Sequence, residues 1–218
     1  MGGWFYQCAA LDRDGLRQLS PLTRSLTGMT IETQNVEPEY LARLRASHRV
    51  LGIPENFLDT SRLPLCIEPE DLVDTEPDYY CRPQKLTPAA NLAWRAMRDA
   101  AAGDGVVLHL ISAFRSIEYQ VQLIRKKLQN GNSIEEILSV VAAPGFSEHH
   151  TGRAIDLNTE NCAVLEESFE KTKAFQWLNV NANNFGFVLS YPRDNNLGIA
   201  YEPWHWCYQP LFNDSHNF

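Results

Sequence analysis

The spacing of apolar residues predicts two helices in the first half of the chain. Residues 38–50 begin with a proline, which is favoured in the first turn of a helix. Thr87 and Pro88 form a second start of this kind, and Gly103 marks the expected end of that helix. The helical repeat predicts that four residues of the second helix face inward: Leu92, Ala96, Met97 and Ala100.

Capping residues predict further helices in the second half. Ser116 is expected to begin one helix, and Ser133 with Glu136 has the spacing of a capping box for the next. Thr172 is expected to begin a last helix, which Gly186 ends. The residues expected to face inward are Ile117, Val121, Ile124 and Leu128 in the first of these helices and Ala174, Phe175, Leu178 and Ala182 in the last.

Short runs rich in β-branched and aromatic residues predict strands at 106–112, 187–191 and 201–208. Helices come first and strands gather later, which favours an α+β fold with a small central antiparallel sheet over alternating βαβ units. The helices are expected to pack on one side of this sheet. Because the regular pattern begins at residue 85, residues 85–218 are predicted to form the main domain.

Residues 1–84 are predicted to be an N-terminal extension and a loop-rich arm that packs on the core. The first 28 residues show no clear period and are expected to be loosely attached. Residues 67–80 carry six acidic residues and no basic one. Their spacing does not match a calcium-binding loop, so this segment is interpreted as a solvated surface loop.

Composition and charge narrow the function classes. The chain has 218 residues, 44% hydrophobic and 21% charged, as expected of a globular protein with one sizeable core. Its net charge of −8 argues against a nucleic-acid partner. No apolar run is long enough to span a membrane. The N-terminal residues make a poor secretory signal, which predicts a cytoplasmic protein, or a periplasmic one if a signal was trimmed. We expect a monomer.

The cysteines indicate neither a disulfide framework nor a cysteine zinc site, because their number is odd and no two form a CxxC pair. Free thiols are typical of a reducing compartment. The five residues are Cys8, Cys66, Cys81, Cys162 and Cys207.

Two short segments carry the candidate chemistry. His149 and Asp156 lie in one, and Glu202 and His205 lie in the other. Two histidines and one carboxylate can form a catalytic zinc site, which leaves a fourth position for water. Glu202 could then accept a proton from that water and pass it to a leaving amine. A lone histidine is more often an ordinary polar residue, and His150 could replace its neighbour as the ligand.

The pattern around His205 supports this interpretation in part. In a regular strand, Trp204 and Trp206 would point to the opposite face from His205. Glu202 would also point away, but Pro203 predicts a bend or a strand end between them. A bend would bring Glu202 and His205 to the same metal ion.

Three ordered motifs resemble those of a known family. They are SAFRS at 112–116 followed by Gln120, SEHHTGRAID at 147–156, and EPWHW at 202–206. Together they are similar to the motifs of VanY-type D-alanyl-D-alanine carboxypeptidases, which are grouped with VanX dipeptidases, lysostaphin-type endopeptidases and the hedgehog signalling domain. The resemblance covers roughly residues 85–210 and implies the fold of that group.

The resemblance also implies roles for the motif residues. His149, Asp156 and His205 would bind Zn²⁺, and Glu202 would act as general base and acid. Manganese or cobalt could substitute for zinc in vitro.

The resemblance further implies that Arg115 binds the terminal carboxylate of the substrate, with help from Ser147, and that Gln120 hydrogen-bonds the substrate backbone. A guanidinium group suits this task because it pairs with a carboxylate through two parallel hydrogen bonds. The chain departs from the family at Ala113 and Phe114, where glycine and tyrosine are usual, so a tyrosine hydroxyl contact is lost.

The implied function is a zinc-dependent carboxypeptidase that removes the C-terminal D-alanine from peptidoglycan peptides. The bond could be the L,D bond of a tetrapeptide or the D,D bond of a D-Ala-D-Ala end. A cytoplasmic location favours the L,D bond, because a cytosolic D,D enzyme would consume the wall precursors of its own cell. The alternatives are a non-catalytic zinc-holding peptidoglycan-binding module, against which Glu202 and Arg115 argue, and an endopeptidase, which would need no carboxylate anchor.

Overall fold

The computed structural model describes residues 36–210. The expectations for the first 28 residues and for Cys8 lie outside this range. The elements in chain order are α1 (Pro38–Leu51), α2 (Phe57–Thr60), β1 (Val73–Asp74), β2 (Lys85–Leu86), α3 (Pro88–Gly103), β3 (His109–Ser112), α4 (Ile117–Gln129), α5 (Ile134–Leu138), η2 (Glu148–Thr151), β4 (Ala154–Asn158), η3 (Glu167–Lys171), α6 (Lys173–Asn181), η4 (Ala182–Phe185), β5 (Phe187–Leu189) and β6 (His205–Tyr208).

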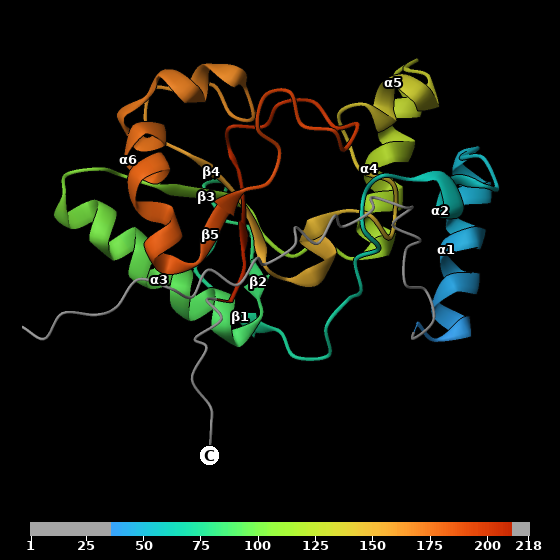
Figure 1. Ribbon diagram of the computed structural model, residues 1–218, viewed down its shortest axis with the longest axis horizontal. Coiled ribbons are helices and arrows are strands. Elements are labelled where there is room, and N and C mark those ends of the chain that lie inside the picture. Colours follow the sequence, from blue (N-terminus) through green and yellow to red (C-terminus); the bar gives the residue numbers. More distant parts are fainter. Residues whose placement is uncertain (1–35, 211–218) are drawn as a thin grey trace, which may run out of the picture. The chain divides into compact units, whose positions relative to one another are not determined.

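Four strands form one antiparallel sheet in the order β3-β4-β6-β5 (Figure 1). All five residues of β4 are buried, as expected of a central strand whose two faces are both covered. The register pairs Asp156 of β4 with His205 of β6 on one side and with Ser112 of β3 on the other. β1 and β2 form a separate two-stranded sheet. The predicted α+β fold with a small antiparallel sheet is confirmed.

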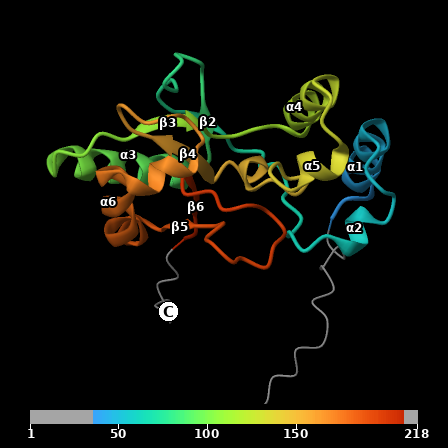
Figure 2. The same cartoon turned by 90° about the horizontal axis from the view of Figure 1, so that it is seen from above.

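The buried apolar side chains form two clusters. One joins the sheet to α3 and α6 and includes Trp94, Phe187 and Trp206. The other joins α1, α2, α4 and α5 and includes Leu44 and Ile124. Two views show α3 and α6 beside the sheet, and α1, α2, α4 and α5 on the far side of the segment that leads into β4 (Figure 1, Figure 2). That segment, between the two clusters, carries the candidate site motif that begins at Ser147.

The predicted caps at Ser116, Ser133 and Thr172 are confirmed, whereas Thr87 occupies the N-cap position of α3 without a side-chain hydrogen bond. Ser116 accepts a hydrogen bond from the third backbone N–H of α4, and Thr172 accepts the equivalent bond in α6. Ser133 and Glu136 form the predicted capping box. The predicted inward residues of α6 are all buried; in α4 two of them are buried and two are half-buried.

The predicted inward face of α3 is wrong in part. Leu92 is 74% exposed, whereas Trp94 is fully buried. The buried stripe of this helix is Ala90, Trp94, Met97 and Ala101. The indole of Trp94 decides the orientation, because its ring fills the core and its N–H donates to Glu76 at 2.6 Å.

The interpretation of residues 67–80 as a solvated loop is also wrong in part. Glu68 accepts a hydrogen bond from the first backbone N–H of α4 at 2.7 Å. Glu76 accepts the indole N–H of Trp94, and Asp78 is buried. These acidic residues are structural acceptors because they lie beside backbone and side-chain donors that would otherwise be unpaired.

Within residues 36–210 no disulfide is present, since the four cysteines there are free: Cys66, Cys81, Cys162 and Cys207. None of the helices in the described part of the chain has both the length and the apolar character needed to cross a bilayer.

Candidate metal and catalytic centre

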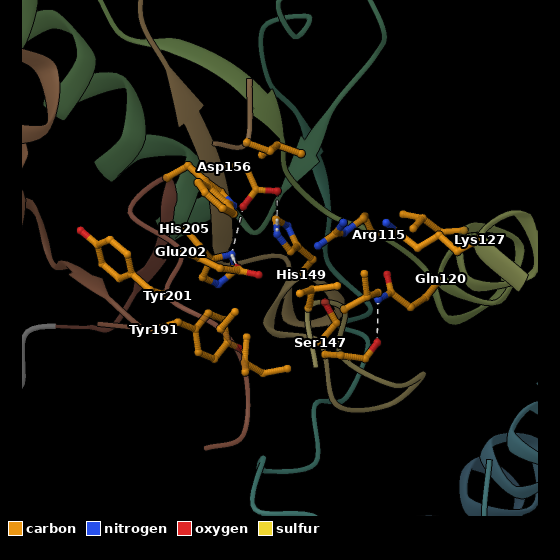
Figure 3. A pocket seen from close by; sticks show the side chains of 18 residues that line it. Arg115, Gln120, Lys127, Ser147, His149, Asp156, Tyr191, Tyr201, Glu202 and His205 are labelled. Atoms are coloured by element: carbon orange, nitrogen blue, oxygen red, sulfur yellow. Dashed lines mark hydrogen bonds and ion pairs between the residues drawn. The ribbon is translucent and has the colours of Figure 1, made fainter. Parts of the chain in front are cut away.

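The sheet register brings the three predicted metal ligands together. Asp156 and His205 are paired on adjacent antiparallel strands, so their side chains lie on the same face. His149 lies in η2, and Gly152 ends that turn with a φ of 63°, a left-handed conformation in which glycine is favoured. One donor atom from each of His149, Asp156 and His205 lies within 4.8 Å of the others (Figure 3).

The donor atoms of this cluster are buried and face one another. Nε2 of His149 lies 3.2 Å from Oδ2 of Asp156, and Nδ1 of His205 lies 3.0 Å from Oδ1. Apart from this contact with Asp156, the buried Nε2 of His149 has no hydrogen-bond partner among the described residues, as expected of a nitrogen that binds a metal ion. His150 is not part of this cluster, and its Nδ1 contacts the backbone oxygen of Arg115 at 2.6 Å.

The charges of the cluster follow from burial and hydrogen bonding. Burial, together with the nearby Arg115 guanidinium, lowers the pKa of His149 to about 4. Burial also opposes a charge on His205, but hydrogen bonds to Asp156 and Glu148 outweigh it and raise the pKa of His205 to about 10. Despite burial, the two histidines hold the pKa of Asp156 far below its usual range. His149 is therefore neutral, with a free lone pair, near neutral pH.

Glu202 reaches the same cluster from the turn before β6. The backbone N–H of His205 donates to the carbonyl oxygen of Glu202 at 3.1 Å, which closes a turn where Pro203 predicted a bend. One carboxylate oxygen of Glu202 lies 3.9 Å from Nδ1 of His205. Burial, with a smaller contribution from Asp156, raises the pKa of Glu202 to about 7. A carboxylate with this pKa can accept and return a proton near neutral pH.

The three predicted substrate residues line one pocket with the metal cluster. Arg115, Gln120 and Ser147 face a cavity of about 320 Å³ that also contains His149 and Glu202. Nε of Arg115 is buried without a hydrogen-bond partner among the described residues, so the guanidinium can receive an anion. Nε2 of Gln120 donates to a backbone oxygen of the pocket wall at 2.8 Å, and its Oε1 is unpaired within residues 36–210.

The structure adds Lys127 and Tyr191 to the pocket wall. Lys127 extends towards Arg115 (Figure 3) and forms no ion pair with any residue in 36–210. The sequence could have indicated Lys127 as a pocket residue, because Gln120 and Lys127 are two helical turns apart and share a face of α4. The ring of Tyr191 lies 4.9 Å from that of His205, and no local pattern indicated this contact.

In both cluster histidines, the ring nitrogen that does not face Asp156 (the outer nitrogen) also has a partner. Nδ1 of His149 contacts the carbonyl oxygen of Ala113 at 2.5 Å. Nε2 of His205 lies 2.9 Å from a carboxylate oxygen of Glu148. No sequence signal identified Glu148, because it is simply the residue before a predicted ligand.

This arrangement is typical of one class of protein. Two histidines and an aspartate that line a cavity suit a catalytic zinc ion that keeps a position for water. A carboxylate with a raised pKa lies beside them, and an unpaired guanidinium lies in the same pocket. The fold and the site thus have the features expected of a metallopeptidase.

Comparison with known families leads to the same group. The family described as VanY, D-alanyl-D-alanine carboxypeptidase, matches residues 83–211. The chain belongs to this VanY family of D-alanyl-D-alanine carboxypeptidases, as the motifs indicated. The match contains all seven predicted site residues.

Individual relatives and solved structures agree. The chain is 34% identical over 166 residues to the putative carboxypeptidase YodJ of Bacillus subtilis, covering 71% of this chain and 60% of that protein. It is 32% identical over 120 residues to a D-alanyl-D-alanine carboxypeptidase of Enterococcus faecalis, covering 50% and 43%. The solved structure of the LdcB LD-carboxypeptidase matches with a TM-score of 0.58 and 32% identity, covering 65% of this chain and 69% of that one. The chain thus spans about half the length of the curated relatives.

Proposed function

We propose that this protein is a zinc-dependent carboxypeptidase that removes the C-terminal D-alanine from peptidoglycan peptides, with a preference for the L,D bond of a tetrapeptide. The observation that carries the proposal is the presence in one pocket of three buried metal-ligand side chains, Glu202 and an unpaired Arg115. A catalytic metal, a proton carrier and an anchor for a chain end are the parts that such a reaction needs.

His149, Asp156 and His205 would hold the zinc ion. Zinc, when bound, lowers the pKa of a coordinated water to about 7 and polarises the scissile carbonyl group. Glu202 would accept the proton of the attacking water at its carboxylate and deliver it to the departing amine of D-alanine. Its raised pKa of about 7 supports both transfers, because neither protonation state is strongly favoured near neutral pH.

Arg115 would bind the carboxylate of the terminal D-alanine, and Lys127 would add a second positive charge beside it. Two cations that extend towards one another without an acidic partner in the described chain favour an anionic ligand (Figure 3). Ser147 and Gln120 would hydrogen-bond the last residue of the peptide; both line the same pocket as Arg115, which supports this role. An endopeptidase would not need these charges.

The opposite arm of the pocket supports the L,D preference. Leu165, Tyr201 and Trp204 also line this pocket. Tyr201 lies on the other side of the metal cluster from Arg115 (Figure 3). In a D-Ala-D-Ala end, the residue before the cleaved bond has only a methyl side chain. In a tetrapeptide it is a long diamino acid, which would use this apolar and aromatic arm.

We also propose that residues 36–84 are a structural arm of the peptidase rather than a separate domain. The side chain of Gln84 accepts a hydrogen bond from the N–H of Ala113, whose carbonyl oxygen contacts His149. Glu68 accepts a hydrogen bond from the first backbone N–H of α4, the helix that carries Gln120 and Lys127.

The test is mass spectrometry of the zinc-loaded protein with two substrates, a muramyl tetrapeptide and a pentapeptide that ends in D-Ala-D-Ala. Loss of one alanine from the tetrapeptide is expected, with little or no change in the pentapeptide. Cleavage of the pentapeptide alone would refute the L,D preference and leave a D,D-carboxypeptidase. If neither peptide changed while zinc was bound, a non-catalytic binding module would be the better interpretation.

A further inference from the structure

Glu148 is a largely buried carboxylate that the proposed reaction does not use. It directly precedes His149 in η2, and its side chain is 21% exposed. It does not line the substrate pocket. One of its carboxylate oxygens lies 2.9 Å from Nε2 of His205, so it approaches this ring from the side away from the other ligands.

The two nitrogens of His205 therefore face different carboxylates. Nδ1 lies 3.0 Å from Asp156 and belongs to the metal cluster, whereas Nε2 lies 2.9 Å from Glu148. A bound metal ion would take the place of one ring proton, which leaves an imidazole with one N–H and one lone pair directed at the metal; the carboxylate of Glu148 would keep the remaining proton on Nε2. With the proton on Nε2, the lone pair of Nδ1 faces the metal cluster.

We propose that Glu148 is a positioning residue that fixes the tautomer and ring orientation of His205, so that Nδ1 is the metal-binding nitrogen. This inference rests on the proposed zinc site. Carboxylate partners of metal-bound histidines orient the ring and make it a stronger donor.

His149 shows the contrasting arrangement. Its metal-facing nitrogen is Nε2, and its Nδ1 contacts the backbone oxygen of Ala113 at 2.5 Å. A backbone acceptor cannot be removed by substitution. Of the two histidines, only His205 depends on an exchangeable side chain, which makes the role of Glu148 directly testable.

The experiment compares zinc affinity, by competition with a chromophoric chelator, in the wild type, Glu148→Gln and Glu148→Ala. Glu148→Ala should weaken zinc binding about 10- to 100-fold, the usual cost of losing such a partner. Glu148→Gln keeps an acceptor oxygen without the charge and should lie between the two. Glu135→Ala, which removes an exposed glutamate of α5, is the matched control and should bind zinc like the wild type.

Melting temperatures of the zinc-free proteins separate positioning from a merely structural role. Wild-type zinc affinity in a folded Glu148→Ala protein would overturn the inference. So would a fall in melting temperature without a loss of zinc affinity. If Glu148→Ala does not fold, the decision rests on nitrogen-15 spectra of histidine in the zinc-loaded wild type. Protonated Nε2 and metal-bound Nδ1 are expected for His205, and the reverse assignment would refute the proposal.

Zinc binding and peptide cleavage by the wild type distinguish a failure of the proposed function from a failure of the role of Glu148. A wild-type protein that takes up no zinc would refute the proposed function and this inference together. A wild type that binds zinc and cleaves the tetrapeptide, beside a Glu148→Ala protein with unchanged affinity, would refute the role of Glu148 alone.

Discussion

The two ends of the pocket are built in opposite ways. At the metal end, Asp156 lies between the two histidines, and Glu148 and the carbonyl of Ala113 hold their outer nitrogens. At the substrate end, Nε of Arg115 has no hydrogen-bond partner and Lys127 has no ion pair within residues 36–210. The metal end is organised by the chain itself, whereas the proposed substrate end has positive charge without an acidic partner in residues 36–210.

Because of this difference, substitutions at the two ends of the pocket are expected to change different properties of the protein. Groups that are satisfied inside the chain contribute to the stability and geometry of the folded protein, so their loss should change stability or metal affinity. Unpaired cations contribute little to folding, and their loss should appear in substrate affinity. Each substitution below tests whether an effect falls on the expected side of this division.

The largest effect is expected from Glu202→Ala. Loss of the proton carrier should lower kcat about 100- to 10,000-fold while zinc affinity stays close to that of the wild type. Steady-state kinetics on the tetrapeptide and zinc titration of the same sample measure both. An active Glu202→Ala protein would show that another group carries the proton.

Arg115→Met should produce the next largest effect. Loss of a charged, two-bond contact to the terminal carboxylate should lower kcat/KM about 100-fold. Kinetics with a C-terminally amidated peptide provide the control. The amide should be a poor substrate for the wild type, and Arg115→Met should cause little further loss with it. Equal losses on both peptides would contradict the anchor role.

A smaller effect is expected from Lys127→Met, because its half-buried ammonium group is partly screened by solvent. KM should rise about fivefold with kcat nearly unchanged, which corresponds to an ion pair of about 1 kcal/mol. Lys126→Met changes the neighbouring exposed lysine of α4 and is the matched control. If both substitutions raised KM equally, the effect would come from net charge rather than from the pocket.

The smallest effect on activity is expected from Asp78→Asn, which acts on stability. Asp78 accepts hydrogen bonds from Arg82 at 2.6 Å and from Gln84 at 2.9 Å, and Gln84 holds Ala113 behind the metal ligand His149. The variant should be about 2 kcal/mol less stable near neutral pH, because buried donors lose a charged acceptor. Urea unfolding at pH 7 measures this difference.

The pH dependence of that loss has a defined sign. Although burial opposes the charge, hydrogen bonds from the backbone N–H and the side chain of Arg82 hold the folded pKa of Asp78 below its usual value. The ionised carboxylate therefore stabilises the fold above a pH of about 4, and this contribution disappears as pH falls through the folded pKa. The difference between wild type and Asp78→Asn should shrink towards pH 3. Asp74→Asn, at an exposed ion pair with Lys85, should change stability little at either pH.

Much of the fold could be predicted because its signals are local. The caps at Ser116, Ser133 and Thr172 bind backbone groups within three or four residues, so the local sequence alone indicates them. The inward face of α3 was mispredicted, because Trp94 orients that helix through distant core contacts and through Glu76. The spacing of apolar residues in a helix does not reveal which distant segment will pack against it.

The site likewise has features that the local sequence predicts and features that depend on tertiary contacts. The sequence by itself determined the residue types and the order of the motifs, which sufficed to predict His149, Asp156, Glu202 and His205 as one centre and Arg115 as its companion. Only the tertiary structure decided that Asp156 pairs with His205 across two strands. It alone placed Glu148 behind His205, turned Lys127 towards Arg115, and made buried acceptors of acidic residues that resemble a solvated loop. The physical reason is that donors and acceptors are matched through space, between segments whose separation along the chain carries no information about their contact.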